Sequence, residues 1–140
     1  FWRDARRETE LREPARAVLA SVGLSARADT RVDRLSHGEH RQLEIAIALA
    51  ARPQLLLLDE PMAGLGPDES ARMMEMLRGL KGTVTVLLIE HDMETVFALA
   101  DRITVLVYGR IIASGDPAAI RADPAVREAY LGEAEAHGHD

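Results

Sequence analysis

A short apolar run constrains the fold of this chain more than any other feature. Residues 54–58 read Gln-Leu-Leu-Leu-Leu and lie between Pro53 and the acidic pair Asp59-Glu60. A run of this length and composition is typical of a strand buried on both faces of a parallel sheet. Residues 84–89 repeat the pattern after Gly82, so we expect a second buried strand there.

The remaining segments have mostly helical patterns. Ser36 is an N-cap candidate with Glu39 in capping-box position, and Gly23 is placed to end the preceding helix. Pro67 opens a later helix with Asp68 and Glu69 in its first turn, where the helix dipole favours acids. The expected helices cover residues 3–22 (interrupted by Pro14), 36–52, 67–81, 93–100, 117–122 and 124–131.

Strands alternating with these helices predict an α/β fold. Two further strands are expected at 103–107 and 110–113, joined by a turn at Tyr108-Gly109. The helix after Pro67 should turn four apolar side chains toward the core: Met73, Met76, Leu77 and Leu80.

Composition excludes several classes of protein. The net charge is −6 and the 17 basic residues are scattered, whereas a nucleic-acid binder normally presents a basic face. Cysteine is absent, which excludes disulfides and cysteine-ligated zinc. The apolar runs are too short to cross a bilayer.

Ionisable side chains follow both predicted strands. Asp59 and Glu60 would lie at the carboxyl edge of the sheet, where α/β proteins bind ligands. An Asp there can hold Mg²⁺, and a Glu can accept a proton from an attacking water. His91 follows the second strand and is placed to contact a phosphate or to position water. Alternatively, the acids begin an ordinary turn and the histidine is structural.

Ser36-His37-Gly38 falls where a helix begins. Free N–H groups, a hydroxyl and the positive end of the helix dipole form a phosphate site, and Gly38 permits a close approach. For these residues alone, an ordinary helix cap is the simpler interpretation.

In this order, the motifs resemble those of the ATP-binding subunits of ABC transporters. Leu35–Glu39 matches the signature loop, Leu55–Glu60 the Walker B strand and Ala63–Gly66 the D-loop, while His91 matches the switch histidine. Three further stretches most resemble the branched-chain amino-acid importer (LivG-type) branch, and urea importers look similar: Leu43–Ala46, Ile89–Met93 and Arg127–Gly132.

The resemblance implies roles for individual residues. ATP and Mg²⁺ are the implied cofactors: Asp59 would support Mg²⁺, Glu60 would polarise the attacking water, and His91 would contact the γ-phosphate. The signature residues Ser36, His37, Gly38 and Glu39 would face the ATP of a partner subunit. His37 and Glu39 replace the commoner Gly and Gln, which looks compatible with the importer branch.

The resemblance also implies partners and a domain layout. The partners would be a second ATP-binding subunit and transmembrane permease subunits, on the cytoplasmic face of the inner membrane. Residues 1–35 would belong to the helical subdomain, 36–131 to the C-terminal part of the ATPase core, and 132–140 to a disordered tail.

A P-loop requires a Gly-Lys-Ser/Thr ending, but the single lysine, Lys81, precedes Gly82. We therefore expect a partial P-loop-type ATPase domain without its N-terminal half. Alone it should be inactive and either marginally stable or self-associating. Alternative functions are a non-catalytic module that supplies the signature loop in trans or docks on a permease, and a soluble ABC ATPase of repair or translation. The latter is disfavoured because there is no long heptad segment and no basic face.

Overall fold

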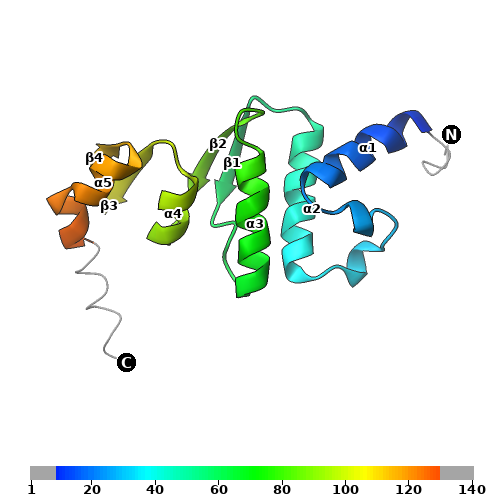
Figure 1. Ribbon diagram of the computed structural model, residues 1–140, viewed down its shortest axis with the longest axis horizontal. Helices are drawn as coiled ribbons and strands as arrows, with labels where there is room; N and C mark the ends of the chain where they lie inside the picture. The colour runs from blue at the N-terminus through cyan, green and yellow to red at the C-terminus, as the bar shows by residue number, and fades with distance from the viewer. Residues whose placement is uncertain (1–8, 130–140) are drawn as a thin grey trace. The chain divides into compact units, whose positions relative to one another are not determined.

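The computed structural model describes residues 9–129 as helices, strands and connecting turns (Figure 1). The chain divides into two compact units, one ending at His91 and the next beginning at Asp92. Each unit has its own helices and strands. The proposed tail, 132–140, lies outside the described residues, and the proposed boundary after residue 35 stays a prediction.

The first helix described in this unit is α1 (Thr9–Ser21), which contains Pro14 without ending there. Gly23 adopts φ +78°, and its N–H donates to the carbonyl of Ala20 at 3.1 Å. The Leu24 N–H donates to the carbonyl of Leu19 at 2.8 Å. These two bonds satisfy the last carbonyls of the helix in a Schellman arrangement, so the predicted C-cap at Gly23 is confirmed.

Two short 3-10 turns, η2 (Ser25–Arg27) and η3 (Val32–Arg34), lead into helix α2 (His37–Ala50). The predicted capping box is present: the Glu39 N–H donates to Ser36 Oγ at 3.3 Å, and the Ser36 N–H donates to Glu39 Oε2 at 2.9 Å. Arg52 adopts φ +50° just before Pro53, which turns the chain out of the helix.

Strands β1 (Leu55–Asp59) and β2 (Thr85–Ile89) pair in parallel, with Leu57 opposite Leu87 and Asp59 opposite Ile89. Helix α3 (Pro67–Gly79) connects them, and α2 and α3 lie side by side in Figure 1. The predicted core face of α3 is confirmed, since all four side chains are buried. The buried apolar residues of this unit are Val22, Leu24, Ile45, Ala46, Leu56, Met73, Met76, Leu77 and Leu80.

The prediction that both strands are buried on both faces is wrong for the described residues. Leu55 and Leu57 are 56% and 62% exposed, and Leu87 and Ile89 are 52% and 50% exposed. Successive side chains alternate along a strand, so these four residues share one face of the sheet, which we call the open face. The apolar run correctly indicated a strand, but an apolar residue is buried only where another element covers it.

The second unit contains helix α4 (Met93–Leu99), strands β3 (Ile103–Val107) and β4 (Arg110–Gly115), and helix α5 (Pro117–Ala122). The strands form an antiparallel hairpin. The predicted turn is confirmed, with positive φ at Tyr108 and Gly109. Residues 124–129 are helical. The core forms around Ile103, Ile120 and Val126.

Arg121 of this unit places its guanidinium 4.3 Å from the centre of the Phe97 ring, a cation–π contact between α5 and α4. Of the helices formed by residues 9–129, none has the length and apolar character needed to cross a bilayer.

Candidate functional site

The parallel pairing of β1 and β2 brings two functional candidates to one edge of the sheet. The Glu60 N–H donates to the Ile89 carbonyl at 2.9 Å, which extends the ladder past Asp59. His91 Nδ1 lies 3.4 Å from Glu60 Oε1. Both side chains are accessible, at 78% and 50% exposure for histidine and glutamate. A carboxylate and an imidazole at this separation can together hold and polarise a water molecule.

Glu60 adopts φ +43°, a left-handed conformation that is uncommon for a residue with a side chain. Glu90, the residue directly after β2, stabilises the loop that follows β1. The Glu90 Oε1 accepts a hydrogen bond from the Met62 N–H at 3.2 Å. This role of Glu90 is not predictable from the sequence, because the contact joins two segments that are 28 residues apart along the chain.

Asp59 ends β1 with an exposed side chain. Within residues 9–129 no group of three or more His, Cys, Asp or Glu residues is arranged to hold a metal ion. Mg²⁺ usually keeps several waters and takes one or two carboxylates plus phosphate oxygens. A single accessible carboxylate therefore fits one position of a magnesium site whose other ligands come from elsewhere.

The Ser36 hydroxyl and the Gly38 N–H converge on one carboxylate oxygen. The hydroxyl donates to Glu69 Oε1 at 2.9 Å, and the Gly38 N–H donates to the same oxygen at 3.1 Å. The pKa of Glu69 lies below its ordinary value because of the Ser36 hydroxyl first and the Gly38 N–H second. These donors thus form an anion site at the start of α2, occupied by an acid from α3.

Gly38 is buried, and a Cβ at this position would lie 2.8 Å from Glu69 Cδ and Oε1. This contact requires a glycine, as long as Glu69 keeps its place. Sequence reasoning placed Glu69 in the first turn of α3 but missed its contact with the signature residues. No local signal exists for that contact, since the two partners are 31 residues apart.

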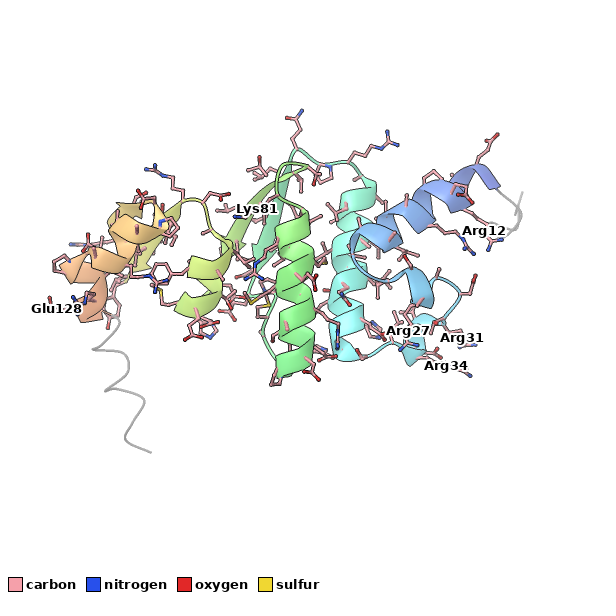
Figure 2. The ribbon with its side chains drawn as sticks, viewed as in Figure 1. Arg12, Arg27, Arg31, Arg34, Lys81 and Glu128 are labelled. Atoms are coloured by element: carbon pink, nitrogen blue, oxygen red, sulfur yellow. The ribbon has the colours of Figure 1, made fainter. Side chains whose placement is uncertain are left out.

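Glu39 is held by an ion pair as well as by the capping box. Arg27 Nε lies 2.6 Å from Glu39 Oε1, and Figure 2 shows the Arg27 side chain beside the first turn of α2. The pKa of Glu39 is lowered, first by the Ser36 N–H and then by the Arg27 guanidinium. The structure therefore gives Glu39 a positioning role at this loop.

A cavity of about 290 Å³ adjoins the loop and is polar on most sides. Its walls include Arg27, Glu39, Gln42, Glu69 and Arg72. Gln42 is buried, and its amide donates to the Val22 carbonyl at 3.0 Å, which fixes that wall. The lining thus contains two arginines and two glutamates, and Arg27 is paired with Glu39, so its formal charges balance.

His37 is exposed, and its imidazole lies against the D-loop region: a Cβ on Gly64 would be 3.5 Å from His37 Nε2. The predicted site residues therefore gather in two groups within the first unit. Ser36, Gly38 and Glu39 form one group, and Glu60 and His91 the other, with Asp59 at the same sheet edge.

Comparison with known proteins finds ABC transporter ATP-binding proteins. Residues 3–63 match the family model described as ABC transporter, and residues 110–136 match the one described as branched-chain amino acid ATP-binding cassette transporter. The chain is 41% identical over 131 residues to the high-affinity branched-chain amino acid transport ATP-binding protein LivG of Escherichia coli K12. That alignment covers 92% of this chain and 51% of LivG.

The chain is likewise 44% identical to BraF of Pseudomonas aeruginosa, a protein of the same description, again with 92% and 51% coverage. Among solved structures it resembles the ADP conformation of MJ1267, an ATP-binding cassette of an ABC transporter. The TM-score is 0.77 at 33% identity, over 90% of this chain and 52% of that one. The α/β cassette fold is thereby confirmed, and the chain spans about half the length of the curated relatives it matches.

Proposed function

Because this chain belongs to the ABC transporter family of ATP-binding proteins, we propose that it forms part of an ATPase subunit that powers solute import. The names of its relatives support branched-chain amino acids, or a similar small solute, as the cargo. The convergence of the Ser36 hydroxyl and the Gly38 N–H on one anionic oxygen carries this proposal, because a phosphate offers oxygens of the same kind.

Glu60 and His91 serve the hydrolytic step. The Glu60 carboxylate accepts a hydrogen bond from the attacking water and draws off its proton as the oxygen approaches phosphorus. His91, 3.4 Å away, holds a phosphate oxygen with its imidazole and keeps the carboxylate oriented. The ladder bond from the Glu60 N–H to Ile89 fixes the spacing between the two residues.

Asp59 is the residue that supports Mg²⁺. When bound, the ion neutralises negative charge on the phosphates. The exposed carboxylate at the end of β1 can supply one oxygen, directly or through water.

Ser36, His37, Gly38 and Glu39 act on the ATP held by a partner subunit. The hydroxyl and N–H groups bind phosphate oxygens, while Glu39 and the Arg27 pair keep the loop in shape. This role requires a second ATP-binding subunit, and the family's work in transport requires permease subunits. We place the assembly on the cytoplasmic face of the inner membrane.

The test measures ATP turnover by the protein that the complete reading frame encodes, where that protein contains these residues together with a P-loop. Glu60→Gln should lower ATP turnover by ~10²–10⁴-fold, the range for loss of a positioned general base. Glu75→Gln, on the exposed side of α3, is the matched control and should leave turnover unchanged. Equal turnover in wild type and Glu60→Gln would contradict the catalytic assignment.

Ser36→Ala tests the signature role separately. Turnover should fall, while ATP binding by the same subunit is retained, because Ser36 serves the nucleotide of the other subunit. The 140 residues by themselves contain no P-loop and should show no turnover. If Ser36→Ala lowers ATP turnover while Glu60→Gln leaves it unchanged, the chain is a module that supplies the signature loop in trans.

A further inference from the structure

Glu69 occupies the place that the proposed function assigns to a phosphate. Its Oε1 accepts from both the Ser36 hydroxyl and the Gly38 N–H, at 2.9 and 3.1 Å. The single proton of the hydroxyl is engaged in this bond, and the hydroxyl oxygen accepts from the Glu39 N–H. A second anion therefore cannot take these donors while Glu69 holds them.

We propose that Glu69 is an internal competitor for the signature loop, so that a nucleotide phosphate reaches Ser36 and Gly38 only by displacing its carboxylate. The inference rests on the proposed function, because it requires the loop to bind phosphate. It adds a resting state in which α3, the helix that follows the D-loop residues, is tied to the start of α2.

The surroundings of Glu69 provide a place for the displaced carboxylate. Arg72 lies one turn further along α3 and lines the same cavity of about 290 Å³. Residues three apart on a helix are neighbours, so a rotation of the Glu69 side chain can bring it toward the guanidinium. The carboxylate that leaves the loop thus keeps a cationic partner.

Steric fit supports the same conclusion. A Cβ at position 38 would meet the Glu69 carboxyl group at 2.8 Å, so the acid fills the space directly over the loop backbone. A phosphate that binds the Gly38 N–H needs that same space. Occupation by one anion therefore excludes the other on steric grounds as well as through the shared donors.

Inorganic phosphate is the probe for the test. The ¹⁵N-labelled chain is titrated at pH 7 and constant ionic strength, and the Gly38 amide resonance is followed. In Glu69→Gln and Glu69→Ala the half-saturating phosphate concentration should be at least about tenfold lower than in wild type, because the variants remove a charge-assisted acceptor. Asp68→Asn is the matched control: it removes a charge from the same exposed helical turn and should behave as wild type.

Equal half-saturation in wild type and both Glu69 variants would overturn the inference, as would a Gly38 amide that responds to phosphate in no variant. The glutamine variant keeps the size of the side chain, so its half-saturating phosphate concentration can be compared with that of wild type even if alanine disturbs the fold. The ATPase test above separates the two proposals. If Ser36→Ala abolishes turnover while Glu69 variants titrate as wild type, the proposed function stands and the competitor role fails.

Discussion

Two adjacent leucines of β1 provide a direct test of the open face. Leu56 is 5% exposed, whereas Leu57 is 62% exposed and lies opposite Leu87 on the uncovered side of the sheet. Each is replaced by alanine in turn. Both variants make the same change in the same strand, so the difference between them reports the packing and burial of the two side chains.

The expected costs follow from these exposures. Leu56→Ala removes a core side chain and should lower the free energy of unfolding by about 2–5 kcal/mol. Leu57 buries a little over a third of its surface, and full burial of a leucine is worth ~1.5–3 kcal/mol. Leu57→Ala should therefore cost only about 0.6–1.1 kcal/mol.

Urea unfolding followed by circular dichroism measures both values, at several protein concentrations. At the lowest concentration the two variants should differ by at least about 1 kcal/mol. Equal costs there would refute the reasoning, because Leu57 would then be buried in solution. A cost for Leu57→Ala that grows with protein concentration would show that copies of the chain cover the open face.

Three further predictions concern caps, turns and acid. Ser36→Ala removes the N-cap of α2 and should cost ~0.5–2 kcal/mol in chemical unfolding, so unchanged stability would contradict the capping role. Gly109→Ala, at φ +75°, should cost about 1–2 kcal/mol, whereas Gly79→Ala, in α3 with no atom near its Cβ position, should be neutral or stabilising. Folding lowers the pKa of Glu39 and Glu69 from their ordinary 4.5, so their stabilisation is present above that pH and is lost as the pH falls through the folded values. The unfolding free energy of the Glu39→Gln/Glu69→Gln double variant should accordingly fall less between pH 5 and pH 3 than that of wild type, and parallel curves would contradict the assignment.

Local chemistry explains which parts of the fold were predictable. The capping box at Ser36 and Glu39, the cap at Gly23 and the turn at Tyr108-Gly109 depend on residues within a few positions of one another. Such interactions leave a pattern in the sequence because the partners are at fixed spacing. The burial of β1 was not predictable in this way, since it depends on which element covers each face.

In the candidate site, too, features set by local spacing were predictable and contacts between distant segments were not. The sequence placed Glu60 and His91 at the ends of two strands, and the parallel register then brought them to 3.4 Å. The contacts of Glu69 with Ser36 and of Glu90 with Met62 were missed, because a long-range pair of this kind has no fixed spacing. The electrostatic preference for acids at a helix start already accounts for Glu69 in the sequence, without any contact to Ser36.

The close approach of Gly38 to Glu69 has a consequence for how this sequence can change over time. With Glu69 present, alanine at 38 displaces the carboxylate and loses two hydrogen bonds. With alanine at 69 the contacts at 2.8 Å with the carboxyl group are gone, and only the contact at 3.1 Å with the Cβ of residue 69 remains. The cost of the same substitution at 38 thus depends on the residue at 69. A lineage therefore replaces the glycine at lower cost once it has lost the acid.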